Sequence, residues 1–213
     1  MSSPVHCPLC LSPRHHALPV AGKGYYRCLA CELVWMDEAD HLDEGAEKAV
    51  YDGHDNQVDD PRYRGFLMRA FGEVLSRVSP PACGLDFGCG PGPALIAMGR
   101  ESGFDMAGYD KFYADQPELL TRRYDFITST EVIEHLAAPR AVLDGLWACL
   151  NPGGVLVLQT QRVLGDERFK SWRYRHDPTH IVFFAEASFR ALAARWQADL
   201  CFPHADVAVF TKP

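Results

Sequence analysis

Along most of this chain, segments in which apolar residues have helical spacing follow short apolar runs typical of strands. Over residues 63–78 the apolar side chains stand three or four positions apart, which predicts a helix with one buried face. Short apolar runs predict strands at 84–87, 105–109, 126–129, 154–160 and 206–211. Helical spacing predicts helices at 94–101, 117–122, 139–150 and 186–196. Strands that alternate with helices are typical of a mostly parallel sheet, so the pattern predicts an α/β fold.

A glycine-rich turn joins the first of these strands to the next helix. Residues 85–92 read LDFGCGPG, and glycine, which lacks a Cβ and tolerates positive φ, lets the backbone of Gly88, Gly90 and Gly92 approach a ligand. Asp110 ends the following apolar run, at about the ~20-residue distance expected of a carboxylate that binds ribose hydroxyls. The turn therefore predicts a nucleotide-like cofactor.

The spacing of the glycines indicates which cofactor is meant. A dinucleotide site has the pattern G-x-G-x-x-G and a phosphate loop needs Gly-Lys-Ser/Thr, and neither pattern occurs at this turn. The strand also carries Asp86, whose charge would repel a diphosphate. S-adenosylmethionine has a cationic amino group and a sulfonium, so it suits an acidic neighbour better.

Two further blocks follow this turn in a characteristic order. Residues 124–136 read YDFITSTEVIEHL, and residues 150–158 read LNPGGVLVL. Together with residues 85–92 they resemble the class I S-adenosylmethionine-dependent methyltransferases, within the broad group of the ubiquinone-pathway O-methyltransferases. The resemblance covers about residues 83–160. It implies a Rossmann-like sheet, mostly parallel with an antiparallel last strand, that binds S-adenosylmethionine.

The resemblance also implies roles for the residues of the first block. Asp86 would lie near the methionine end of the cofactor, Gly88, Cys89, Gly90 and Gly92 would form the turn beside it, and Asp110 would accept both ribose hydroxyls. Only about 14 residues separate Asp110 from Tyr124, where the family usually has a helix and a further strand. We therefore expect that strand to be reduced or missing, with Asp115 as the candidate contact for the adenine amine.

The second block places Glu131, Glu134 and His135 after a strand, at the sheet edge where open α/β proteins bind ligands. Histidine titrates near neutrality, so His135 is a candidate general base, by analogy with the related O-methyltransferases. Glu134 and His135 could equally cap a helix and support other residues. Glu131 is a candidate hydrogen-bond acceptor on the cofactor or substrate side.

A second cluster of aromatic and cationic residues lies at 172–180. It could bind an anionic or aromatic acceptor, with His180 as an alternative base, or form a solvated loop in which Trp172 and Tyr174 pack on the core. The apolar run 181–184 follows directly, and we expect it to anchor His180 at the sheet edge.

Four cysteines near the N-terminus have metal-site spacing. Cys7, Cys10, Cys28 and Cys31 form two C-x2-C pairs 17 residues apart, which is typical of a zinc ribbon with an intervening hairpin. Four thiolates leave no open coordination position, so the predicted Zn²⁺ is structural. Two disulfides are the alternative. The remaining thiols lie singly and are interpreted as buried or incidental: Cys83, Cys89, Cys149 and Cys201.

These patterns divide the chain into a zinc ribbon at 1–36, a linker or lid at 37–64 and a methyltransferase domain at 65–213. The 213 residues, 47% of them hydrophobic, suffice for one large core and a small appendage. The net charge of −7 argues against a general nucleic-acid surface. No apolar run approaches a membrane span, so we expect a cytoplasmic protein, and its oligomeric state stays open.

The predicted function is methyl transfer to a small-molecule acceptor at oxygen, with carbon acceptors left open because sugar C-methyltransferases also combine an N-terminal zinc module with this fold. One alternative is a zinc-ribbon RNA methyltransferase, against which count the acidic charge and the absence of an Asn/Asp-Pro-Pro-Tyr/Phe motif after Ile127. The other is a non-catalytic module that binds a partner or senses the cofactor. The intact glycine turn argues against the latter.

Overall fold

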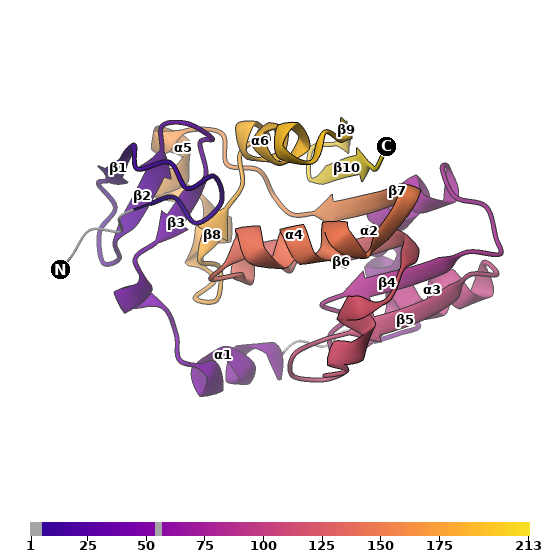
Figure 1. The fold of residues 1–213 in the computed structure, drawn as a ribbon. Helices are drawn as coiled ribbons and strands as arrows, with labels where there is room; N and C mark the ends of the chain where they lie inside the picture. Colours follow the sequence, from indigo (N-terminus) through magenta and orange to yellow (C-terminus); the bar gives the residue numbers. More distant parts are fainter. Residues whose placement is uncertain (1–5, 54–56) are drawn as a thin grey trace.

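The computed structural model describes residues 6–53 and 57–213 of the chain. In these residues six strands form one large sheet in the order β5-β4-β6-β7-β10-β9 (Figure 1). Neighbours among β5, β4, β6 and β7 are parallel, whereas β10 is antiparallel to both β7 and β9. The strands are β4 (Cys83–Phe87), β5 (Asp105–Tyr109), β6 (Tyr124–Thr130), β7 (Leu150–Gln159), β9 (Asp199–His204) and β10 (Val207–Thr211). The predicted sheet, including its antiparallel end, is confirmed.

Helices cover both faces of this sheet because side chains alternate along each strand. Phe126 of β6 packs with the helices α2 (Pro61–Leu75) and α3 (Ala94–Glu101) in one apolar cluster. The next residue, Ile127, belongs to a second cluster with α4 (Pro139–Cys149) and α6 (Glu186–Trp196). Strands β7 and β10 divide in the same way, so two apolar layers enclose the sheet. None of the described helices is long and apolar enough to cross a membrane.

The large sheet has no strand between β5 and β6 in the sequence, as the short segment after Asp110 predicted. Strand β5 forms its edge, and residues between β5 and β6 contain only the single-turn helix η2 (Pro117–Thr121). The prediction of a reduced or missing strand is confirmed. The physical reason is length, because about a dozen residues or more are needed for one parallel crossover.

A smaller sheet in the described residues has the order β1-β2-β3-β8. Strands β1 (His15–Leu18) and β2 (Tyr25–Cys28) form the hairpin predicted between the two cysteine pairs, and β3 (Val34–Met36) follows. The fourth strand, β8 (Val182–Phe183), comes from the C-terminal part of the chain and pairs with β3. The apolar run 181–184 thus joins the small sheet, a pairing that the sequence did not predict.

Residues 37–53 contain a helix that the apolar pattern did not predict. After the single turn η1 (Glu38–Asp40), helix α1 (Glu44–Tyr51) begins at Asp43, whose side chain accepts a hydrogen bond from the Ala46 N–H. None of its residues is fully buried, so it has no strong apolar stripe to reveal it. In Figure 1 α1 lies beneath β8 and α4, apart from the other helices. The chain between β7 and β8 adds α5 (Asp166–Ser171) and the single turn η4 (Arg173–His176).

Gly84 shows how tightly the large sheet is packed against its helices. A Cβ at this position would lie 2.2 Å from the Phe126 ring and 2.5 Å from the Met106 sulfur. We expect Gly84→Ala to lower the free energy of unfolding by about 1–3 kcal/mol, because overpacking a filled core is unfavourable. Urea denaturation measures the change. Gly72→Ala is the control: its Cβ meets nothing within 4 Å in α2, and alanine there should stabilise by ~0.5–1 kcal/mol. Equal unfolding midpoints for the two variants would contradict the packing argument.

Candidate cofactor and acceptor site

A cavity of about 830 Å³ lies at the carboxyl ends of β4, β5 and β6. The glycine turn and the end of β5 form one wall, and the loop after β6 forms another. Aromatic residues line much of it, and α4 contributes an apolar end with Val142 and Leu146. The aromatic lining residues are Tyr51, Tyr63, Phe66, Phe87, Tyr109, Phe112 and Tyr113. A cavity of this size takes a ligand as large as a nucleoside-type cofactor together with a small molecule.

The glycine turn has the backbone geometry that its sequence predicts. Gly88 and Gly90 have φ values of +81° and +62°. A Cβ on Gly88 would lie 2.3 Å from Val132, so that position must remain glycine for the turn to pack on the loop after β6. A Cβ on Gly90 would meet nothing within 4 Å, because Gly90 faces the cavity.

Asp110 connects this turn to the loop after β5. Its Oδ2 accepts a hydrogen bond from the Gly90 N–H at 3.0 Å, and its Oδ1 accepts from the N–H groups of Phe112 and Tyr113 at 2.8 and 3.2 Å. A carboxylate has about four acceptor positions, so these three bonds leave roughly one for a ligand. Asp110 lines the cavity and both shapes its wall and presents a carboxylate to its interior.

Asp86 is buried beneath the glycine turn, with 6% of its surface exposed. It accepts a hydrogen bond from the Thr128 hydroxyl at 2.9 Å. Burial raises the pKa of Asp86 to about 7, because the ionised form loses its hydration. A positive charge bound close to Asp86 would reverse this preference and favour the carboxylate, which is how an acidic strand end selects a cationic ligand.

Two carboxyl groups and a tyrosine meet at the opposite wall. The Tyr174 hydroxyl lies 2.9 Å from Glu131 Oε2 and is also hydrogen-bonded to Glu134 Oε1. Burial raises the pKa of both Glu131 and Glu134; the neighbouring Glu134 carboxyl adds to the rise at Glu131, and Asp177 adds to the rise at Glu134. Tyr174 has one hydroxyl proton and can donate it to only one of them, so a proton on the carboxyl pair completes the network. Glu131 adopts φ +52°, a strained conformation that is common at functional sites.

Two histidines lie beside this carboxyl pair. His135 Nδ1 is 3.0 Å from the Thr179 carbonyl, and His180 Nδ1 is 2.7 Å from the Tyr174 carbonyl. A carbonyl only accepts, so Nδ1 of each ring carries the hydrogen and Nε2 of the neutral ring has the lone pair. The ring centroids are 4.7 Å apart and both residues line the cavity. Ligand atoms of Glu134, His135 and His180 lie within 4.8 Å of one another, a donor set that also suits a divalent cation.

Helix α1 covers part of the cavity. Glu47 and Tyr51 line it, and the Tyr51 ring contacts the His135 ring edge-on at 5.3 Å. Lys111 forms an ion pair with Glu47 at 2.7 Å, and the Tyr113 hydroxyl donates to Asp52 at 2.7 Å. The loop after Asp110 therefore holds the helix that lies over the site.

The four N-terminal cysteines converge on one point. Their sulfurs lie within 4.8 Å of one another, with 3.7 Å between Cys7 and Cys31 and 3.5 Å between Cys10 and Cys28. A tetrahedral Zn²⁺ with Zn–S bonds of about 2.3 Å requires sulfurs about 3.8 Å apart, whereas a disulfide requires about 2.05 Å. All four thiols are free. The donor set and its spacing fit a structural zinc ion.

The comparison with known proteins assigns the chain to a family. A sequence model of the methyltransferase domain matches residues 35–200. The chain belongs to this methyltransferase family. Among curated relatives, the ubiquinone biosynthesis O-methyltransferase of Psychrobacter arcticus is 34% identical in an alignment 102 positions long, which covers 36% of this chain and 39% of that protein. That of Serratia proteamaculans is 27% identical over 88 residues, 41% of this chain and 36% of the relative. The chain thus matches about two-fifths of the length of these relatives.

Solved methyltransferase structures have the same fold. The 1,6-didemethyltoxoflavin-N1-methyltransferase of Burkholderia thailandensis is 17% identical, with a TM-score of 0.53 over 93% of this chain and 99% of that chain. An S-adenosylmethionine-dependent methyltransferase from Archaeoglobus fulgidus is 12% identical, with a TM-score of 0.53 over 70% and 94%. The predicted fold and family, a class I S-adenosylmethionine-dependent methyltransferase, are confirmed.

The cavity of this methyltransferase brings together most residues that the sequence nominated. Gly88, Cys89, Gly90, Asp110, Glu131, His135 and His180 all line it. Gly92 and Asp86 are buried and Asp115 is exposed, and none of these three is among its described lining residues. Asp115 therefore contributes no wall for an adenine ring in this structure. Its proposed contact, like the other individual roles, stays a prediction.

Several site residues escaped the sequence interpretation. Tyr51, Tyr63 and Phe66 line the cavity from helices that precede the glycine turn, and Val132 packs on Gly88. Tyr174 was expected either in an acceptor-binding cluster or packed on the core, and its contacts with Glu131 and Glu134 were not predicted. An aromatic side chain on an amphipathic helix has no sequence signal that separates a ligand contact from a core contact, so only the structure identifies these residues.

A substitution at Gly90 should affect cofactor affinity more than it affects folding stability. We expect Gly90→Ala to weaken S-adenosylhomocysteine binding by about tenfold or more, because the new Cβ enters the cavity, and to cost only ~1–2 kcal/mol of stability from the left-handed backbone. Calorimetry and urea denaturation measure the two effects. Gly22→Ala is the control, since Gly22 also has a positive φ and a free Cβ position but lies in the turn between β1 and β2, outside the cavity lining. Unchanged affinity in Gly90→Ala would show that the cofactor lies elsewhere.

Proposed function

We propose that this methyltransferase transfers the methyl group of S-adenosylmethionine to a hydroxyl oxygen of a small aromatic acceptor. The observation that carries this proposal is the meeting of His135, His180 and Glu131 with the glycine turn in one cavity. A phenolic acceptor must lose its proton as the methyl group transfers, and a neutral imidazole Nε2 is a suitable base. The aromatic lining favours a flat, partly apolar acceptor. The ubiquinone biosynthesis O-methyltransferases among its relatives also methylate oxygen, as their name states.

The cofactor would lie between the glycine turn and Asp110. The backbone of Gly88, Cys89 and Gly90 would contact its amino-acid part, and the remaining acceptor position of Asp110 would bind a ribose hydroxyl. Asp86 would stabilise the positive charge from below. The bound cofactor supplies an electrophilic methyl group, and the protein's task is to align the acceptor oxygen with it and to exclude water.

His135 and His180 would act at the acceptor end. Nδ1 of each ring faces a carbonyl, that of Thr179 or Tyr174, so Nε2 is the atom through which either neutral ring would receive a proton. His180 Nε2 also lies 3.9 Å from Asp177 Oδ2. The partly protonated Glu131 and Glu134 pair would orient the acceptor through hydrogen bonds. Helix α1 would cover this end, in keeping with the predicted lid, because Tyr51 already contacts His135.

The N-terminal sheet is proposed to bind one structural Zn²⁺ through Cys7, Cys10, Cys28 and Cys31. The four sulfurs have the separation that a tetrahedral ion needs. The thiolates would join the turn before β1 to the turn after β2. These bonds would add to the stability that the small sheet gains from packing on the main apolar cluster.

An acceptor screen tests the proposed reaction. With labelled S-adenosylmethionine, we expect label to appear on phenols and catechols rather than on sugars or RNA. His135→Gln or His180→Gln should lower the rate about 10²–10⁴-fold for the residue that acts as base, with S-adenosylhomocysteine affinity retained. The control is His204→Gln, an exposed residue beside Glu73. Assays run with and without a divalent transition-metal ion such as Mn²⁺ or Fe²⁺, because Glu134, His135 and His180 form a donor set that suits one.

Three outcomes would contradict this proposal. Label on RNA alone would favour the RNA methyltransferase alternative, which the net charge of −7 disfavours. Cofactor binding without transfer to any acceptor would favour a sensing or interaction module. Full activity in both histidine variants would remove the proposed base.

Metal analysis tests the zinc site. Purified protein should contain about one zinc ion per chain, and Cys10→Ser should lower that content and the stability of the small sheet, because one of four ligands is lost. Cys201→Ser is the control, since Cys201 is exposed and lies outside the cluster. The zinc assignment would be contradicted if the purified protein contained no zinc, if the four thiols of the N-terminal cluster reacted freely, and if Cys10→Ser left the stability unchanged.

A further inference from the structure

Residues 179–185 connect the zinc-ribbon sheet to the acceptor end of the cavity. All seven are buried, with at most 7% of each residue exposed. They lie between β3 of the small sheet and the loop after β6 that contains Glu134 and His135. We call this stretch the connecting segment.

One side of the connecting segment is held by the small sheet. Val182 and Phe183 pair with Trp35 and Val34 of β3. The Met36 N–H donates to the Ile181 carbonyl at 2.8 Å. Because β3 lies in the middle of the small sheet, a change in that sheet shifts the backbone of the connecting segment.

The other side of the segment is held by the acceptor end. The Ile181 N–H donates to the Glu134 carbonyl at 2.9 Å, and the Thr179 carbonyl accepts from His135 Nδ1 at 3.0 Å. His180 belongs to the segment itself. One short backbone stretch thus sets the tautomer of His135 and the position of His180.

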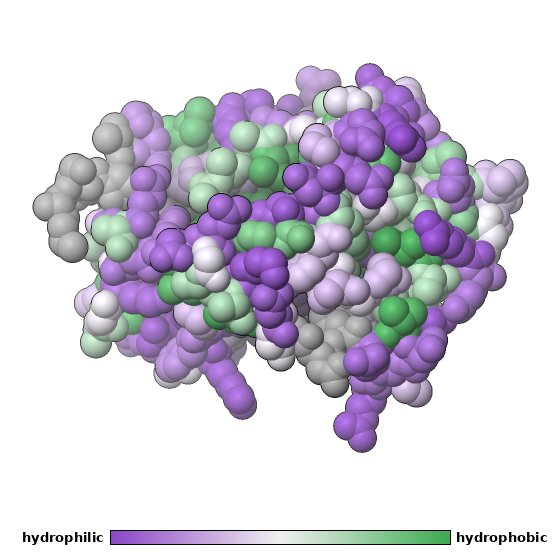
Figure 2. Space-filling model, turned by 90° about the horizontal axis from the view of Figure 1, so that it is seen from below, coloured by the Kyte–Doolittle hydropathy of each residue, from purple (hydrophilic) through white to green (hydrophobic). Residues whose placement is uncertain are grey.

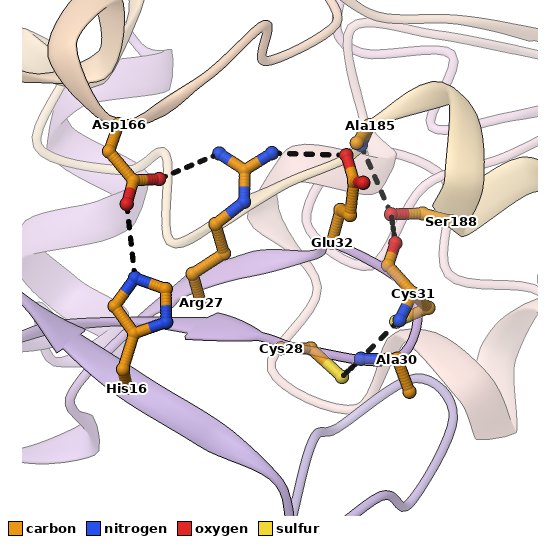
Figure 3. A network of polar contacts seen from close by, with 9 residues as sticks. All are labelled: His16, Arg27, Cys28, Ala30, Cys31, Glu32, Asp166, Ala185 and Ser188. Carbon is orange, nitrogen blue, oxygen red and sulfur yellow. Dashed lines mark hydrogen bonds and ion pairs between the residues drawn. The ribbon is translucent and has the colours of Figure 1, made fainter.

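Ser188 connects the end of the segment to the second cysteine pair. Its hydroxyl donates to the Cys31 carbonyl at 2.8 Å and accepts from the Ala185 N–H at 3.1 Å (Figure 3). Ser188 is fully buried. The same hydroxyl therefore fixes both the backbone of a predicted zinc ligand and the last residue of the connecting segment.

A second connection runs from β2 to α5. Arg27 forms ion pairs with Glu32 of the same sheet and with Asp166, at 3.2 and 3.0 Å, and His16 also contacts Asp166 (Figure 3). Asp166 begins α5, which leads to Tyr174, whose carbonyl accepts from His180 Nδ1. Both hydrogen-bond acceptors that orient the histidines are thus joined to the small sheet.

The cofactor end is held differently. The Gly88 N–H donates to the Tyr109 carbonyl at 2.7 Å, and the Gly90 N–H donates to Asp110. These contacts lie within the large sheet and its loops. A disturbance of the small sheet should therefore reach the histidines before it reaches the glycine turn.

We infer that the metal-bound small sheet positions His135 and His180 through the connecting segment, with Ser188 as a positioning residue. The inference rests on the proposed zinc site and is independent of the acceptor. Loss of the metal would disorder the acceptor end while the glycine turn still binds S-adenosylhomocysteine. The ribbon would then act in catalysis without touching cofactor or acceptor.

Histidine NMR on the full chain tests the inference. The Nδ1–H signals of His135 and His180 are assigned with the His135→Gln and His180→Gln variants. We expect Ser188→Ala to speed hydrogen exchange at His180 Nδ1 by about tenfold or more, while S-adenosylhomocysteine affinity changes by less than about threefold. Ser102→Ala is the matched control: it removes a hydroxyl that donates to the Met98 carbonyl at 2.8 Å in α3, and should change neither.

Removal of the metal is the second test of the inference. Removing bound zinc with a chelator alone, which leaves the Cys89 thiol of the cofactor site unmodified, should speed the same exchange and leave S-adenosylhomocysteine binding unchanged, and adding Zn²⁺ back should restore the signal. If Ser188→Ala does not fold, Asp166→Asn replaces it, because it weakens the Arg27 connection at a half-exposed site. The same readouts then apply.

Two results would overturn the inference. One is an unchanged His180 signal in the folded Ser188 or Asp166 variant. The other is an equal loss of S-adenosylhomocysteine binding and histidine order, which would show that the small sheet supports the whole fold. Protein purified without metal would refute the zinc site and the role of the metal in this coupling, whereas the two variants would still test the coupling between the small sheet and the histidines.

Discussion

The antiparallel pairing of β3 with β8 is the interaction on which the arrangement of this methyltransferase depends. It joins an N-terminal strand to a segment almost 150 residues later and places that segment against the loop after β6. Two residue pairs alone would be a weak contact. The stability comes from burial, since Val182, Phe183 and Phe184 are each at most 2% exposed and full burial of such a side chain contributes about 1.5–3 kcal/mol. The small sheet is therefore part of the same packed structure as the site.

The missing strand has a consequence for how the site is closed. With β5 at the edge of the large sheet, the loop after Asp110 is free to contact α1 through Lys111 and Tyr113. The same loop donates two backbone hydrogen bonds to Asp110. The carboxylate that faces the cavity and the helix that covers it are thus held by one short segment.

Figure 2 shows hydrophilic residues over most of the face seen from below, with hydrophobic residues in scattered patches between them.

Charge is distributed in the cavity walls in a way that matches a cationic ligand. Asp86 lies beneath the glycine turn, and Glu131 and Glu134 lie at the other wall, all with pKa values raised by burial. Carboxyls in this state resist ionisation while the cavity is empty and favour it when a positive charge enters. A diphosphate would gain no such stabilisation from these three carboxyls. The electrostatics therefore agree with the family assignment and with the absence of a dinucleotide glycine pattern.

The sequence by itself determined the elements whose signal is local. Helices α3 and α6 and strand β5 have the predicted bounds, because a stripe or run of apolar residues records which side of an element is buried. The glycine turn and the paired cysteines were also evident, since each depends on spacing over a few residues. Tertiary structure alone decided the partner of β8, the placement of α1 and the meeting of Tyr174 with Glu131 and Glu134. The spacing of apolar residues shows that one face of an element is buried, but it does not show which element covers that face. Helix α1 has no fully buried residue, so it has no apolar stripe in the sequence. Residues some 40 positions apart share a proton only once packing has brought them together.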